Sequence, residues 1–86
     1  SYIMDYSFRT IISAQLLYNN YDKALEYYIK KLNETRDSTD NQNHPDIASL
    51  LNDIGSIYYK KGDYKKALEY YKKSYEIRKI FNFNNP

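Results

Sequence analysis

His44 is the only histidine in the 86-residue sequence, and it is the first side chain to consider for catalysis or metal binding. It lies in a polar stretch directly before Pro45. No carboxylate or second histidine stands around it at the spacing that a metal site or a general base requires. A histidine in such a stretch is more typical of a loop or a helix cap, and this is the role that we expect for His44.

Catalytic and cofactor-binding motifs are absent from the sequence. It contains no cysteine, so it offers no thiol nucleophile, disulfide or zinc finger. It contains no Gly-x-Gly-x-x-Gly, Gly-x-Ser-x-Gly or phosphate-loop motif, and its two glycines leave little means of bringing backbone close to a phosphate. Asp37 and Asp40 are explained by a solvated loop. We therefore expect that the protein is not an enzyme and binds neither a cofactor nor a metal ion.

Three pairs of adjacent lysines in the second half could indicate nucleic-acid binding. Acidic residues lie among them, Glu69 is spaced to pair with Lys73, and the formal net charge is only +2. Such alternation is typical of a solvated helix face, and helical repeats that read RNA need a regular base-reading pair in each unit. We therefore expect no nucleic-acid partner. The lysine pairs are residues 60–61, 65–66 and 72–73.

Hydrophobic residues make up 42% of the sequence, but 12 of them are tyrosines and no apolar run exceeds three residues. A membrane-spanning helix needs about 20 mainly apolar residues, and a signal peptide needs a continuous apolar region. The sequence therefore predicts no membrane partner and a cytoplasmic location. Its core must be built largely from isoleucine, leucine and tyrosine.

The sequence repeats itself with a period of 43 residues. Shifting it by this length places Tyr21–Tyr28 on Tyr64–Tyr71 with seven of eight positions identical, and ten of the 32 pairs from Asp5 to Arg36 are identical. A period of roughly 20–50 residues is typical of repeat arrays. Six of the 12 tyrosines form three pairs at this offset, which indicates packing material rather than a recognition surface.

Each unit is predicted to contain two antiparallel helices, because apolar residues recur at spacings of three and four. Pro45 is typical of a helix start and Gly62 of a helix end.

The predicted fold is all-α, an α-solenoid of two helix-turn-helix units that forms a fragment of a longer array. The predicted helices are residues 4–18, 22–36, 46–60 and 64–80. The predicted domains are repeat 1 (4–36), an inter-repeat loop (37–44), repeat 2 (45–80) and the start of a linker to a further repeat (81–86). The apolar stripe assigned to the last helix is Tyr64, Ala67, Leu68, Tyr71 and Tyr75.

The second unit resembles a tetratricopeptide repeat, whose signature places leucine, glycine, tyrosine, alanine and an aromatic residue at fixed spacings. The matching residues are Leu51, Ile54, Gly55, Tyr58, Ala67 and Tyr71 in the second unit and Phe8, Ile11, Ala24 and Tyr28 in the first. Ile12 and Gln15 depart from the signature, and both units lack the closing proline. The long period and the His-Pro-Asp-Ile-Ala sequence of residues 44–48 resemble the kinesin-light-chain variety of these repeats.

Small residues at Gly55 and Ala67 stand on facing stripes of the second unit. They allow its two helices to approach closely, with Tyr71 filling the space beside them. We therefore expect structural roles for all three residues.

The resemblance implies a curved array in which the first helix of each unit lines a concave binding face. In the family, asparagines at the position of Asn52 and at the next residue often hydrogen-bond the backbone of an extended peptide. Here the second position is Asp53, which favours a basic or donor-rich ligand, and Arg9 could pair with a ligand carboxylate. The alternative for these positions is a solvated helix face. The predicted concave-face residues are Arg9, Ser13, Leu16, Asn52, Asp53, Ser56 and Tyr59.

Two functions of different classes follow from this pattern. The first is a non-catalytic scaffold that binds a peptide or protein partner. The second is a self-association module in which open repeat ends stack into homo-oligomers, because about three repeats are normally needed for stability. The residues expected at the open end are Tyr75, Ile77, Ile80, Phe81 and Phe83.

Overall fold

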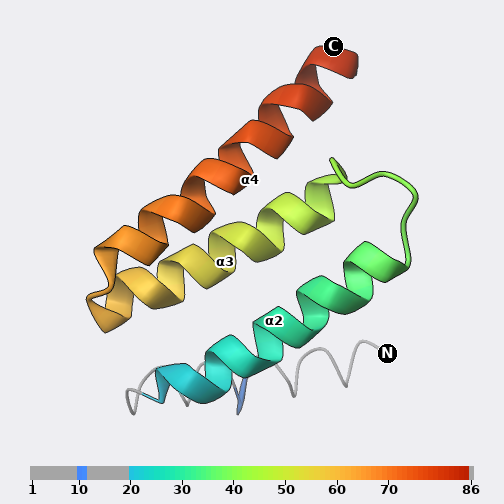
Figure 1. Ribbon diagram of the computed structural model, residues 1–86. Coiled ribbons are helices and arrows are strands. Elements are labelled where there is room, and N and C mark those ends of the chain that lie inside the picture. Colours follow the sequence, from blue (N-terminus) through green and yellow to red (C-terminus); the bar gives the residue numbers. More distant parts are fainter. Residues whose placement is uncertain (1–9, 12–19, 86) are drawn as a thin grey trace.

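The computed structural model describes residues 10–11 and 20–85, and every regular element in that part of the chain is an α-helix (Figure 1). Helices α2 (Tyr21–Asp37), α3 (Pro45–Lys61) and α4 (Tyr64–Asn84) run antiparallel to their neighbours in the sequence. The all-α prediction is confirmed. Thr10 and Ile11 are helical, and the rest of the predicted first helix, residues 4–18, lies outside the described residues.

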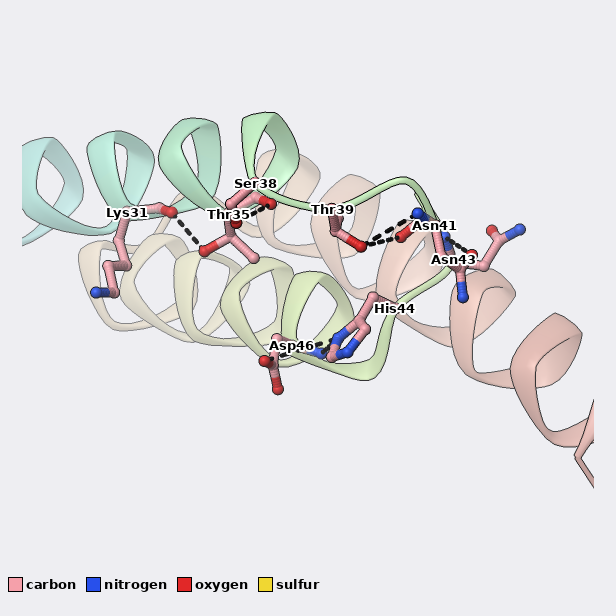
Figure 2. A network of polar contacts seen from close by, with 8 residues as sticks. All are labelled: Lys31, Thr35, Ser38, Thr39, Asn41, Asn43, His44 and Asp46. Carbon is pink, nitrogen blue, oxygen red and sulfur yellow. Dashed lines mark hydrogen bonds and ion pairs between the residues drawn. The ribbon is translucent and has the colours of Figure 1, made fainter.

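The boundaries of α3 follow from its capping residues. His44 is the N-cap, and its Nδ1 accepts a hydrogen bond of 3.0 Å from the backbone N–H of Asp46 (Figure 2). Gly62 ends the helix at φ +90°, a conformation that glycine adopts without strain. Asp63 then caps α4 by accepting a hydrogen bond from the N–H of Lys66, so only two residues separate α3 from α4. The predicted capping role of His44 is confirmed.

The connection between α2 and α3 is held by its own polar side chains (Figure 2). The hydroxyl of Ser38 donates to the carbonyl of Thr35 in the last turn of α2. The side chain of Asn41 accepts from the N–H of Asn43 at 2.9 Å, and the N–H of Asn41 donates to Thr39 Oγ1. These local hydrogen bonds satisfy the carbonyl of Thr35 at the end of α2 and two backbone N–H groups of the connection.

The main apolar core lies between α2 and α3. It is one cluster of buried aliphatic residues, with tyrosines packed around it. Lys61 in the last turn of α3 adds an ion pair of 2.9 Å with Asp22 in the first turn of α2, where both charges suit the helix dipoles. The buried cluster consists of Ala24, Leu25, Leu32, Ile47, Leu51, Ile54 and Ile57.

Small residues bring α3 and α4 together, as the sequence predicts. A Cβ atom added to Gly55 would lie 2.9 Å from the ring of Tyr71 and 3.3 Å from the carbonyl oxygen of Ala67. Further along, the hydroxyl of Ser74 donates a 2.7 Å hydrogen bond to the carbonyl of Ala48, and Ser74 is buried. The helices therefore meet with little space for larger side chains.

The face of α4 that packs on α3 differs from the predicted stripe. Ala67 and Ser74 are buried and Tyr71 is half-buried, but Tyr64, Leu68 and Tyr75 are exposed. The prediction was wrong for these three residues because the sequence shows which positions are apolar and not which of them a neighbouring helix covers.

Helix α4 also continues beyond its predicted end at residue 80. Residues 81–84 are helical, whereas the sequence pattern places the start of a linker there. Nothing in Phe81–Asn84 breaks a helix, and the break comes with Asn85, which precedes a proline and has φ −132° and ψ 66°. The backbone N–H and the side-chain amide of Asn85 both donate to the carbonyl of Phe81, which closes the last turn.

Candidate concave-face site

Four of the seven predicted concave-face residues lie in the described part of the chain, and all four are on α3. With about 100° of rotation per residue, Asn52, Ser56 and Tyr59 share one side of the helix and Asp53 lies further round it. The structure therefore brings together three members of the predicted set along one helix. The residues predicted in the first unit, Arg9, Ser13 and Leu16, lie outside the described residues.

Ser56 makes its hydrogen bonds within the protein. Its Oγ donates to the carbonyl of Asn52 at 3.1 Å and accepts a hydrogen bond of 3.0 Å from the hydroxyl of Tyr71. This arrangement fixes the Tyr71 ring beside Gly55 and uses the only proton of the Ser56 hydroxyl. This contact joins α4 to α3. It could not be predicted from the sequence, because the helical spacing of apolar residues explains Tyr71 without any hydrogen bond from its hydroxyl.

Tyr59 is the exposed member of the site, and Asn52 is half-buried. Among the described residues, the side-chain amide of Asn52 has no hydrogen-bond partner, so it can offer a donor and an acceptor to a ligand. The Tyr59 side chain is 59% exposed, and its ring lies 5.2 Å from that of Tyr64 with the planes tilted by 58°. Tyr64 thus extends the apolar part of the surface, although the sequence pattern assigned it to the packed stripe.

Asp53 is a half-buried carboxylate at the edge of this site. Burial raises its pKa above the ordinary value, and the guanidinium of Arg78 on α4 acts in the opposite direction. A partly desolvated carboxylate attracts a cation or a hydrogen-bond donor more strongly than one in open water. The influence of Arg78 was not predicted from the sequence, because Arg78 lies 25 positions after Asp53 and only the antiparallel packing of α3 and α4 brings the two residues near each other.

No arrangement for metal binding occurs in the described residues. That part of the chain contains no group of three or more His, Cys, Asp and Glu side chains that could hold a metal ion. The Nδ1 atom of His44 is occupied by the N–H of Asp46. None of the described helices is both long enough and apolar enough to cross a membrane.

Comparison with known proteins identifies a repeat family. The sequence profile described as the tetratricopeptide repeat matches residues 19–80, which include α3 and α2 entirely and most of α4. No curated protein and no solved structure matches the chain significantly.

Proposed function

Because the chain belongs to the tetratricopeptide repeat family, we propose that it is a scaffold that binds a peptide or protein partner on its concave face. Repeats of this family generally mediate protein–protein interactions, and the family is generally non-catalytic. On this proposal the first helix of each repeat lines the binding face, and α3 is the first helix of the second repeat. We also propose that the protein is cytoplasmic.

The observation that carries this proposal is that Asn52, whose side-chain amide has no partner among the described residues, and the exposed Tyr59 lie on one side of α3. Seven residues of helix separate them by about 10 Å along the axis. An extended peptide covers that distance with about three residues. The amide of Asn52 can then bond the peptide backbone while a side chain of the peptide packs on the exposed ring of Tyr59.

Asp53 indicates which peptides are favoured. Its carboxylate stands where the family often has asparagine, and it is half-buried. An asparagine both donates and accepts hydrogen bonds, whereas an ionised aspartate only accepts them. We therefore propose that the partner presents lysine, arginine or several N–H donors at this point.

Peptides selected on the 86-residue chain from a displayed random library provide the test. The Asn52→Ala/Tyr59→Ala variant should weaken their binding at least about tenfold in fluorescence anisotropy, because a truncated tyrosine at an interface centre costs that much or more. The control variant Lys23→Ala/Lys65→Ala changes exposed residues away from the site and should bind as the parent chain does. Circular dichroism should be unchanged in both variants. If every selected peptide binds the first variant as well as it binds the parent chain, the concave assignment is wrong.

We further propose that the repeats are of the kinesin-light-chain-like variety. The 43-residue period and residues 44–48 support this assignment, as does the length of α4, which has 21 residues where α2 and α3 have 17 each. Within residues 44–48, His44 is the N-cap of α3 and Pro45 is the first residue of this helix.

The second candidate function is self-association, and a comparison of equivalent residues supports it. Leu25 on α2 is 6% exposed, and Leu68, the equivalent residue on α4, is 55% exposed. Helix α3 packs on α2, while no described element covers the corresponding face of α4. On this alternative, a second copy of the chain covers Leu68 and its neighbours Tyr64 and Tyr75.

Light scattering over a range of protein concentrations tests this alternative. Self-association predicts a mass that rises with concentration, and the Leu68→Glu/Tyr75→Glu variant should then remain monomeric because it places two charges in the interface. The variant Lys66→Glu/Lys73→Glu is a control, because these exposed α4 residues lie on the opposite side of the helix from this face. A mass that stays monomeric for the parent chain removes the self-association function and leaves the scaffold proposal unaffected.

A further inference from the structure

A second surface, separate from the concave face, lies between α2 and α4. The backbones of these two helices do not approach each other closely, because α3 lies between them (Figure 1). A pocket of about 360 Å³ occupies this region and is lined by Arg36 at the end of α2, Asn43 of the α2–α3 connection, Leu51 of α3 and side chains of α4 between residues 72 and 80. None of the concave-face residues lines it, and Leu51 lies about 100° around α3 from Asn52.

The floor of the pocket is aliphatic. Leu51 is buried, Ile77 is half-buried and Ile80 is 41% exposed. A neighbouring pocket of about 340 Å³ shares Ile80 and continues to Phe83, which is largely exposed. Small-molecule sites span roughly 300–1,000 Å³, so each pocket suits one or two apolar side chains rather than a large cofactor.

The rim of the pocket carries an excess of positive charge. Arg36 comes from α2, and Lys72 and Lys73 come from α4. Among the described residues, no carboxylate forms an ion pair with any of these three cations. In particular, the Nζ of Lys73 lies over the ring of Tyr70 at 5.2 Å instead of pairing with Glu69 as its spacing predicts.

The one acidic side chain on the rim is already neutralised. A carboxylate oxygen of Glu76 lies 3.3 Å from the ammonium group of Lys79. Among the described residues, the rim therefore presents three cations that form no ion pair, above a floor that is apolar. Such a surface is complementary to a ligand that combines negative charge with an apolar group.

We propose that this pocket binds an acidic peptide segment that inserts a leucine or phenylalanine between α2 and α4. The apolar side chain covers Leu51 and Ile80, while flanking carboxylates pair with Lys72 and, in bidentate geometry, with Arg36. A nucleic acid fits the site less well, because sequence-independent binding of single strands uses aromatic stacking and the floor is aliphatic. The protein thus has two peptide-binding surfaces of opposite charge preference.

The test uses a fluorescein-labelled hexapeptide in which leucine and phenylalanine stand between two pairs of glutamates. Its anisotropy is measured with the 86-residue chain at low and at physiological salt. We expect saturable binding that weakens with salt, and binding at least about fivefold weaker for a peptide with both apolar residues changed to serine. Equal binding of the serine peptide would overturn the proposal, as would tighter binding of a thymidine oligonucleotide of the same length.

The protein variants distinguish the pocket from general attraction between charges. Lys72→Gln/Lys73→Gln should weaken the hexapeptide about five- to tenfold, since each exposed ion pair contributes modestly. Lys23→Gln/Lys65→Gln removes the same charge from exposed residues outside the pocket and should leave binding unchanged. Ile80→Ser should weaken binding without changing the charge. If the control pair weakens binding as much as the pocket pair does, or if Ile80→Ser has no effect, the proposal fails.

Discussion

Leu25 on α2 and Leu68 on α4 occupy equivalent positions of the two repeats, but Leu25 is 6% exposed and Leu68 is 55% exposed. Two helical turns further along, Leu32 on α2 is 4% exposed, and its equivalent on α4, Tyr75, is 63% exposed. The two faces are similar in sequence, and only the first is covered by α3. At these two positions, burial is therefore decided by the neighbouring unit and not by the residue's own repeat.

The largest expected effect is a difference between two identical substitutions. Leu25→Ala should lower the free energy of unfolding by about 2–5 kcal/mol, because it opens a cavity in the buried cluster. Leu68→Ala should change it by less than about 0.5 kcal/mol, because the side chain is exposed. Urea unfolding of the dilute proteins measures both values. Similar losses would mean that the α4 face is covered in solution.

The second prediction concerns a position at which the two repeats should agree. Ala24 and Ala67 are both buried, so a leucine at either position overfills its contact. We expect Ala24→Leu and Ala67→Leu each to cost about 1–3 kcal/mol in urea unfolding. An unchanged melting temperature in Ala67→Leu would contradict the close approach of α3 and α4 at Gly55.

Ser74 and its equivalent, Lys31, should differ again. Ser74→Ala removes a buried hydrogen bond and leaves the carbonyl of Ala48 without that donor, which should cost about 1–2 kcal/mol. Lys31 is exposed on α2, and Lys31→Ala should lie within about 0.5 kcal/mol of the parent chain. Thermal unfolding monitored by circular dichroism compares the two. Equal melting temperatures would show that the Ser74 hydroxyl contributes nothing to the joining of α3 and α4.

Removal of the cap of α3 should have a somewhat smaller effect. His44→Ala loses the acceptor for the N–H of Asp46 and should cost about 1 kcal/mol, whereas His44→Asn keeps a side-chain acceptor and should cost less. The two helices differ at this point, because Asn20, the N-cap of α2, makes no side-chain capping hydrogen bond. Asn20→Ala should therefore be nearly neutral in the same chemical unfolding experiment.

The smallest effect is expected at Asp53. Burial raises its pKa, so the folded state binds the proton more tightly than the unfolded state and the ionised form lowers stability at neutral pH. Asp53→Asn should raise the free energy of unfolding at pH 7 by less than about 0.5 kcal/mol, because the group is partly solvated. This gain should disappear as the pH falls through the raised pKa towards the ordinary value of 3.8. A gain that is constant over this range would contradict the shift.

Much of the helical architecture could be predicted from the sequence, because it depends on local signals. His44, Pro45 and Gly62 mark the ends of α3 through capping and backbone preference, and each does so in the structure. The close contact of Gly55 with Tyr71 was also predictable, since small residues at matched spacings indicate a close approach of helices.

Contacts between two helices were harder to predict from the sequence. The hydrogen bond from Ser74 to Ala48 crosses 26 positions, and the equivalent of Ser74 in the first unit is a lysine, so the repeat gave no indication of it. Tyr75 was placed in the packed stripe because it is apolar and correctly spaced. Within the candidate site, the positions of Asn52 and Tyr59 along α3 follow from helical periodicity, whereas the engagement of Ser56 by Tyr71 does not.

The separation between the backbones of α2 and α4 has a mechanical consequence. Helix α3 is the only described element that joins them, so a change in the angle at which α3 crosses α2 alters the spacing between Arg36 and Lys72 without breaking any contact inside the α3–α4 hairpin. The gap between these side chains would therefore open or narrow if this crossing angle changed. Bending at α3 would therefore change the width of the pocket, and a force that bends the chain would change how well a ligand fits there.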